Sequence, residues 1–126
     1  GSVMAVLVID DSRAMRSVIK GILCGSGFKV VVAGDGREAL ECLKRGDDIE
    51  AVLVDWHMPR MDGYDFIRAV RAFEAYRDLP VMMVTAESEV EQVNRALAAG
   101  ADEYVMKPFT REAVLEKLNL LGIAPN

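Results

Sequence analysis

The fold is decided by residues 5–11, AVLVIDD, in which five apolar residues run directly into two aspartates. A short apolar run that is rich in β-branched residues and has no polar alternation is typical of a strand buried on both faces of a parallel sheet. The two aspartates then lie at the carboxyl end of this strand, which is the edge where open α/β sheets bind ligands. Two later runs end in a similar way, because Asp55 follows AVLV and Lys107 follows EYVM.

Strand-like runs alternate with helix-like segments along the whole chain. We expect strands buried on both faces at residues 5–9, 29–33, 51–54, 81–84 and 103–106. We expect helices, with apolar residues at helical spacing, at residues 13–24, 36–44, 64–76, 90–98 and 111–121. Strict alternation implies right-handed crossovers, so the sequence predicts an α/β fold with a five-stranded parallel sheet, doubly wound by helices on both faces.

Helix boundaries and chain length agree with one domain. The expected N-terminal caps are Ser12, Asp35, Ser88 and Thr110, and two helices should end near Gly46 and Gly100. A length of 126 residues fits one compact domain, and nothing in the chain has the composition of an interdomain linker. We assign residues 4–122 to this domain, residues 1–3 to an N-terminal extension that starts with a Gly-Ser remnant of cloning, and residues 123–126 to a C-terminal tail.

Composition excludes several classes of function. The net charge of −5 and a pI near 4.9 disfavour direct binding to nucleic acid, because no basic stretch is available to neutralise phosphates. The apolar runs are too short to insert into a membrane and no apolar leader opens the chain, so we expect a soluble, cytoplasmic protein. Cys24 and Cys42 lack the spacing of metal ligands, and we expect both to be buried, reduced thiols.

The acidic residues at the strand ends indicate a metal site. Asp10 and Asp11 could be an ordinary pair at a helix N-terminus, where acids are favoured. A third acid at the same edge, Asp55, exceeds what capping requires, and crowded carboxylates repel unless a cation lies among them. Mg²⁺ prefers such a small site of oxygen ligands. We expect Asp11 and Asp55 to bind the ion directly and Asp10 to hold one of its waters.

Asp55 could serve as a metal ligand alone or also as a nucleophile. A carboxylate can attack a phosphoryl donor to form an aspartyl phosphate if nearby cations offset the negative charge on the phosphoryl oxygens. Mg²⁺ and Lys107 would supply that charge, and Thr85 at the end of its strand would offer a hydroxyl donor. The Lys107-Pro108 bond is open to the cis form, which could direct the lysine inward. A histidine beside three acids also raises zinc as an alternative, but Zn²⁺ prefers nitrogen and sulfur ligands, so an acid-rich site suits it poorly.

These residues resemble the phosphoacceptor site of response-regulator receiver domains. The resemblance rests on Asp10-Asp11, Asp55, Thr85-Ala86 and Lys107-Pro108-Phe109, and it covers nearly the whole chain. The segments DWHMPRMDGYDF (55–66), PVMMVTAE (80–87) and AGADEYVMKPFT (99–110) are most similar to the chemotaxis regulators of that family. The resemblance implies a flavodoxin-like (βα)5 domain over residues 4–122 with the strand order 2-1-3-4-5.

The resemblance also implies a role for each residue of the site. Asp55 would be the phosphorylation site, and Asp10, Asp11, Asp55 and the backbone carbonyl of His57 would hold Mg²⁺. Thr85 and Lys107 would engage the phosphoryl group, and Tyr104 would act with Thr85 as a switch. His57 and Glu87 would flank the path of the attacking water and set the lifetime of the phosphoryl group.

The function implied by the resemblance is that of a phosphorylation-activated response regulator in a two-component phosphorelay. A histidine kinase would donate the phosphoryl group, and the domain would promote its own phosphorylation and dephosphorylation without being an enzyme in the ordinary sense. Output would go to a protein partner, such as a flagellar switch component, at the face of the fourth helix, fifth strand and fifth helix. We expect exposed side chains there, including Val93, Met106 and Lys117, although core packing would equally explain Val93.

Two alternatives follow from the same residues. The chain could be a receiver domain excised from a longer regulator. It could instead be a Mg²⁺-dependent phosphohydrolase with Asp55 as nucleophile, as in haloacid-dehalogenase-type phosphatases. Those enzymes normally place a second aspartate two residues after the nucleophile, where this chain has His57, so we favour the receiver.

Overall fold

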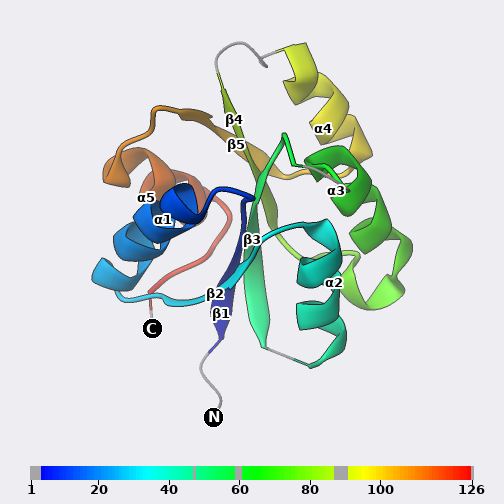
Figure 1. Ribbon diagram of the computed structural model, residues 1–126, viewed down its shortest axis with the longest axis horizontal. Coiled ribbons are helices and arrows are strands. Elements are labelled where there is room, and N and C mark those ends of the chain that lie inside the picture. Colours follow the sequence, from blue (N-terminus) through cyan, green and yellow to red (C-terminus); the bar gives the residue numbers. More distant parts are fainter. Residues whose placement is uncertain (1–3, 47, 59–60, 87–90, 126) are drawn as a thin grey trace.

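The computed structural model contains a five-stranded parallel sheet (Figure 1), and it describes residues 4–46, 48–58, 61–86 and 91–125. The strands are β1 (Ala5–Ile9), β2 (Lys29–Ala33), β3 (Ile49–Asp55), β4 (Val81–Ala86) and β5 (Glu103–Lys107). They lie in the order β2-β1-β3-β4-β5, and each neighbouring pair is parallel. The predicted fold class and strand order are therefore confirmed.

Helices cover both faces of the sheet, as Figure 1 shows. The helices are α1 (Arg13–Gly25), α2 (Gly36–Lys44), α3 (Gly63–Ala72), α4 (Val93–Ala99) and α5 (Arg111–Leu120). One core cluster joins the sheet to α1 and α5 through Ile19, Leu23, Val114 and Leu118, and a second joins it to α2, α3 and α4. Within the described ranges, no helix has both the length and the apolar character that a membrane crossing requires.

The prediction of strands buried on both faces is right for the centre of the sheet and wrong for its edges. All five residues of β1 are buried, and β4 is buried from Val81 to Thr85. In β2, Lys29 is exposed and Val30, Val31 and Val32 are half-buried. β2 and β5 each have a neighbour on one side only, so the helix layers cover them less completely. Apolar composition alone does not distinguish an edge strand from a central one.

Most of the predicted helix ends are confirmed. The side chains of Ser12, Asp35 and Thr110 accept hydrogen bonds from backbone N–H groups in the first turns of α1, α2 and α5. Gly46 and Gly100 follow α2 and α4 with φ values of 88° and 122°, a region that favours glycine. The predicted cap Ser88 lies outside the described residues. Asp62 was not among the predicted caps, and it caps α3 by accepting a hydrogen bond from the Asp65 N–H at 2.8 Å.

The single helix predicted for residues 64–76 is wrong. α3 ends at Ala72, Phe73 is extended with φ −91° and ψ 122°, and a separate 3-10 turn, η1, spans Glu74–Tyr76. Tertiary bonds hold this break, because the Tyr76 hydroxyl donates to the Leu43 carbonyl at 3.0 Å. These partners lie far away in the sequence, so helical periodicity could not predict the break.

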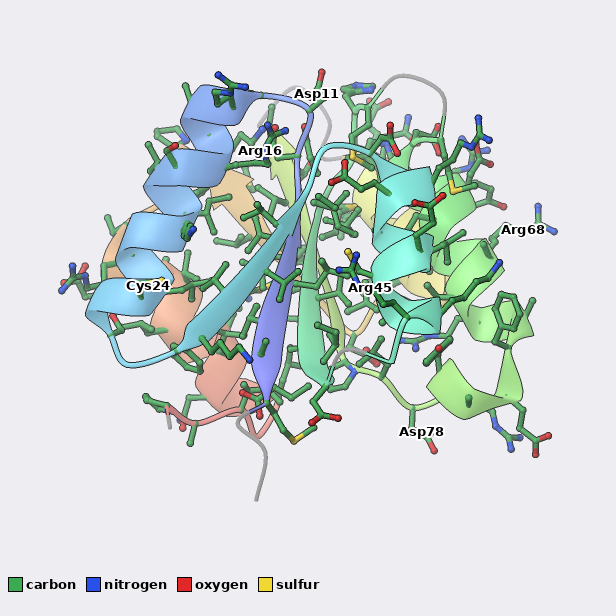
Figure 2. The ribbon with its side chains drawn as sticks, turned by 60° about the horizontal axis from the view of Figure 1, so that its bottom comes forward. Asp11, Arg16, Cys24, Arg45, Arg68 and Asp78 are labelled. Carbon is green, nitrogen blue, oxygen red and sulfur yellow. The ribbon has the colours of Figure 1, made fainter. Side chains whose placement is uncertain are left out.

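Cys24 also departs from the prediction. Both cysteines are free thiols, as expected, but Cys24 is exposed while Cys42 is buried. On α1 it is Ile19 and Leu23 that face the sheet, and Cys24 follows Leu23 around the helix toward solvent. Figure 2 shows Cys24 on the outer side of α1.

Arg71 of α3 holds together the segments around it through hydrogen bonds to η1 and to the turn between α4 and β5. Its Nε and Nη2 donate to the Gly100 carbonyl at 3.0 and 2.8 Å, and its Nη1 donates to the Tyr76 carbonyl at 2.8 Å. Nη2 also binds Asp102 Oδ2 at 2.9 Å, and the same oxygen accepts from the Val81 N–H at 2.8 Å. Only 16% of the Arg71 side chain is exposed, so its bonds to the two carbonyls are partly shielded from water, whereas its bond to the 42%-exposed Asp102 is not.

We predict that Arg71→Ala lowers the free energy of unfolding by about 1–3 kcal/mol, because it removes the donor from two partly buried backbone carbonyls and from Asp102. The matched control is Arg77→Ala, whose ion pair with Glu74 has side-chain exposures of 68% and 89% and should change stability by less than about 0.5 kcal/mol. Urea denaturation of both variants tests this. Equal effects of the two substitutions would show that the Arg71 bonds contribute no more than a surface pair.

Candidate functional site

Three carboxylates converge at the carboxyl edge of the sheet. Asp10 directly follows β1 and is 1% exposed, Asp55 is the last residue of β3 and is 6% exposed, and Asp11 is exposed to solvent. One carboxylate oxygen from each lies within 4.8 Å of the others. Figure 2 shows Asp11 at the end of β1, at the opposite edge of the molecule from Asp78. Parallel pairing of β1 with β3 produces this convergence across residues that are far apart in sequence.

Lys107, the last residue of β5, supplies the positive charge at this edge. Its Nζ donates to Asp55 Oδ1 at 3.3 Å and lies 3.8 Å from Asp10 Oδ2. The peptide bond between Lys107 and Pro108 is cis. One ammonium group therefore faces two nearly buried carboxylates.

Burial dominates the electrostatics of both inner acids. It raises the pKa of Asp55 to about 6, repulsion by Asp10 adds to the increase, and Lys107 and the His57 backbone N–H oppose it. Burial likewise raises the pKa of Asp10, against the lowering effects of the Ser12 N–H and Lys107. Lys107 alone therefore does not compensate the charge of the two buried carboxylates.

The donor set fits a small divalent cation. Asp10 Oδ1 accepts from the Ser12 N–H at 2.8 Å, but its buried Oδ2 has no hydrogen-bond partner among the described residues. A buried carboxylate oxygen without a donor, beside two further carboxylates, is suited to a cation. Since the available ligands are all oxygens, Mg²⁺ suits the site better than zinc.

The remaining predicted residues lie around this cluster. His57 is exposed, and its backbone N–H hydrogen-bonds the Asp55 carboxylate. Thr85 is completely buried, and its Oγ1 donates to the Ala86 carbonyl at 3.3 Å, so in this structure the hydroxyl does not bind Asp55. Glu87 lies outside the described residues. The roles assigned to these three residues stay predictions.

Tyr104 lies on β5 beside the strand that carries Thr85. The register pairs Met83 with Tyr104 and Thr85 with Met106, so Thr85 and Tyr104 share one face of the sheet. The half-buried Tyr104 ring has Lys117 Nζ at 4.9 Å from its centroid, and that Nζ also donates to Glu103 Oε1 at 2.9 Å.

The predicted output face is less exposed than expected. Val93, Met106 and Lys117 are half-buried and not exposed. Val93 packs against the core cluster under α2, α3 and α4, and Lys117 lies against Glu103 and Tyr104. Their exposure depends on neighbouring elements, which the sequence did not reveal.

Two residues that position the site were missed. Arg16 Nη1 donates to the Asp10 carbonyl at 2.7 Å and so fixes the turn between β1 and α1. Gly63 lies so close to the end of β3 that a Cβ there would come within 2.9 Å of the Asp55 carbonyl oxygen. Two sequence signals could have identified these residues. Arg16 is a basic residue one turn into the helix after the acidic pair, and Gly63 is the glycine that begins the helix after Asp55.

Comparison with known proteins identifies the class. The chain matches the response regulator receiver domain family over residues 6–119, and it belongs to that family. Receiver domains of this kind are signalling proteins of two-component systems and not ordinary enzymes, which removes support for the phosphohydrolase alternative. Members of the family bind Mg²⁺ at an acidic pocket, take a phosphoryl group from histidine kinases and act on a downstream target.

The similar proteins narrow the class to relatives of CheY. The chain is 41% identical to a chemotaxis protein CheY homolog of Campylobacter jejuni, with 94% of this chain and 93% of the relative covered. It is 44% identical to the chemotaxis protein CheY of Pseudomonas aeruginosa, with 91% and 93% covered. Among solved structures, Vibrio cholerae chemotaxis protein CheY4 superposes with a TM-score of 0.88 at 33% identity, covering 95% of this chain and 99% of that one. CheY is also the standard example of this strand order.

We predict that Asp55→Asn stabilises the metal-free protein near pH 8 but not near pH 4. The folded pKa of about 6 is above the ordinary value of 3.8, so the stabilising effect of protonation is present below about pH 4 and is lost as pH rises through 6. A shift of about two units corresponds to about 3 kcal/mol. Urea denaturation in a chelator at both pH values measures the difference. A difference between variant and wild type that does not grow with pH would contradict the prediction.

Proposed function

We propose that Asp55 accepts a phosphoryl group and that the domain acts as a phosphorylation-controlled regulator. The observation that carries the proposal is the contact of 3.3 Å between Asp55 Oδ1 and Lys107 Nζ beside the Asp10 and Asp11 carboxylates. A nucleophilic carboxylate, an ammonium group and a cation-binding set of oxygens are the groups that phosphoryl transfer to an aspartate requires.

In the transfer, a carboxylate oxygen of Asp55 attacks the phosphorus of a phosphohistidine on a kinase. The new P–O bond forms as the P–N bond breaks, and the electron pair stays on the histidine nitrogen, which then takes up a proton. Lys107 stabilises the negative charge on the phosphoryl oxygens, and Thr85 donates its hydroxyl to one of them. In a separate hydrolytic step a water attacks the phosphorus, and its P–O bond forms as the P–O bond to Asp55 breaks. The electron pair returns to the Asp55 carboxylate, and the water gives up a proton as inorganic phosphate leaves.

Asp10, Asp11, Asp55 and the backbone carbonyl of His57 would hold Mg²⁺. The bound ion would supply positive charge that offsets the phosphoryl oxygens and the crowded carboxylates. Support comes from the unpartnered Asp10 Oδ2 and from the raised pKa of Asp55, which both indicate missing positive charge. Arg16 and the Ser12 N–H keep the Asp10 turn in place for this role.

Thr85 and Tyr104 would transmit the change to the surface. Movement of the Thr85 hydroxyl toward a phosphoryl group would free space on the sheet face that it shares with Tyr104. The ring could then turn inward and leave Lys117, which now lies over it. A shift of a few kcal/mol between two such states is enough to change a partner's affinity several-fold.

We propose the phosphodonor and the output partner by analogy with the relatives. We assign a histidine kinase as phosphodonor and a protein target on the face formed by α4, β5 and α5. The chemotaxis proteins among the relatives support a role in chemotaxis. Within that role, we propose a flagellar switch component as the target. The two free thiols are suited to the reducing cytoplasm. We retain residues 4–122 as the receiver domain, between an N-terminal extension at residues 1–3 and a tail at residues 123–126.

We predict that Mg²⁺ changes the fluorescence of Trp56, which adjoins Asp55 and is the single tryptophan of the chain. Asp11→Ala should weaken the affinity by about tenfold or more, because it removes a direct ligand. Asp78→Ala, at the opposite edge of the molecule, removes the same charge and is the control (Figure 2). Fluorescence titration measures both, and equal affinities in the two variants would remove Asp11 from the metal site.

Acetyl phosphate should phosphorylate the protein once per chain, at Asp55, and only when Mg²⁺ is present. Catalysis of this transfer is mainly positioning and charge neutralisation, so the domain should promote the reaction without a kinase. Intact mass spectrometry with and without a chelator is the measurement. Asp55→Asn, which keeps the size of the side chain, should stay unlabelled, and labelling equal to wild type would identify another nucleophile.

We predict that His57 and Glu87 set the lifetime of the phosphoryl group while contributing little to stability. His57 is exposed beside the site, and its backbone groups survive substitution. His57→Ala or Glu87→Ala should change the rate of phosphoryl loss by about tenfold, which needs only about 1.4 kcal/mol of barrier height. Loss of label followed over time decides this. Wild-type rates in both variants would assign the lifetime to the inner residues Thr85 and Lys107 and to the metal.

A further inference from the structure

A basic groove lies between α3 and α4, away from the carboxylate cluster. Its volume is about 550 Å³, it is open to solvent, and Tyr64, Arg68, Arg71 and Arg95 line it together with alanines of both helices. The alanines leave the space between the helices unfilled because their side chains are short. Figure 1 shows α3 and α4 side by side on the same face of the sheet, and Figure 2 shows Arg68 on the outer side of α3.

The three arginines of the groove are not equivalent. Arg71 uses its donors within the fold, and its charge is paired with Asp102 at 2.9 Å. Arg68 and Arg95 are exposed, and within the described part of the chain they form neither an ion pair nor a hydrogen bond. The groove therefore carries two arginine side chains without an ion-pair partner among the described residues, on a protein whose net charge is −5.

Tyr64 holds these two charges in place. The guanidinium carbon of Arg95 lies 4.2 Å from the centroid of the Tyr64 ring, and that of Arg68 lies 5.7 Å from it. Stacking on an aromatic ring leaves the N–H groups at the edge of the guanidinium plane free to bind a carboxylate in a bidentate manner. Both arginines are thus positioned in advance, which lowers the entropic cost of binding.

We propose that the groove between α3 and α4 is a docking site for an acidic peptide segment of a protein partner. Glutamate or aspartate side chains would pair with Arg68 and Arg95, while the peptide's apolar atoms would pack on the alanines and Tyr64. An open groove along two helices suits an extended segment, whereas a small anion is usually held by several converging donors in an enclosed pocket. This inference does not depend on phosphorylation of Asp55.

One pair of contacting aromatic rings links the groove to the residue that follows Asp55. The Tyr64 ring meets the Trp56 ring edge to face, with centroids 6.1 Å apart and an angle of 74° between the planes. Trp56 directly follows Asp55 and is 5% exposed. Binding in the groove should therefore change Trp56 fluorescence, although the peptide does not touch the tryptophan.

The test uses the metal-free, unphosphorylated protein and a fluorescein-labelled peptide of glutamates as probe. We expect fluorescence anisotropy to show saturable binding at low salt, and a terminally blocked unlabelled peptide to change Trp56 emission. Arg68→Gln combined with Arg95→Gln should weaken binding about tenfold or more. Arg77→Gln combined with Arg111→Gln removes the same charge from exposed positions outside the groove and should keep near wild-type affinity. Circular dichroism checks that both variants fold.

Several outcomes would overturn the proposal. Equal weakening in the two double variants would mean that the peptide responds only to overall charge. Displacement of the peptide by an equal concentration of inorganic phosphate would identify a small-anion site. A dimer in sedimentation experiments that is abolished by the groove variant alone would identify a second copy of this chain as the occupant. An identical Trp56 response in the groove variant would place the peptide elsewhere.

Discussion

The contact between Lys107 and Asp55 is the interaction on which the site depends. Asp10 and Asp55 are nearly buried, and burial raises the pKa of each. Repulsion by Asp10 raises the pKa of Asp55 further. Lys107 opposes this effect from the end of β5, 3.3 Å from Asp55 and 3.8 Å from Asp10. The compensation is incomplete, and one oxygen of Asp10 has no hydrogen-bond partner among the described residues. The fold therefore holds a site with an excess of negative charge, and this excess is what makes a divalent cation and a phosphoryl group suitable occupants.

The residues that stabilise the domain and the residues of the carboxylate site lie in different parts of the sheet. Below the carboxyl edge, side chains such as Leu7, Leu53 and Met82 are fully buried between the helix layers, and each contributes about 1.5–3 kcal/mol through burial. Hydrogen bonds from Arg71 to Tyr76, Gly100 and Asp102 hold the loops together at the opposite end of the sheet. The acids and Lys107 lie at strand ends, outside this apolar core. A site that costs stability can be tolerated there because the layers beneath it do not depend on it.

Two surfaces of different character flank this site. The face of α4, β5 and α5 connects to it through the shared sheet face of Thr85 and Tyr104. The basic groove connects to it through the contact of Tyr64 with Trp56, which follows Asp55. Helix α4 takes part in both surfaces, since Arg95 lines the groove and Val93 packs toward the core. Both connections consist of side chains that lie next to residues at strand ends. A change of charge at Asp55 would reach these side chains first.

The sequence by itself determined the parallel α/β fold, the caps Ser12, Asp35 and Thr110, and the edge at which Asp10, Asp11, Asp55 and Lys107 meet. These features depend on local patterns, because strand and helix periods and capping side chains act within a few residues. Only the tertiary structure decided that α3 ends at Ala72, that Cys24 is exposed, that β2 is half-buried, and that Arg16 and Gly63 support the site. It also brought Arg95 of α4 onto the ring of Tyr64 of α3, which Arg68 approaches from its own helix. The end of α3 and the Arg95 contact depend on partners that are distant in the chain, and a sequence pattern does not show which distant segments meet. The Arg16 and Gly63 contacts are shorter in range, but they depend on how the chain turns after β1 and β3.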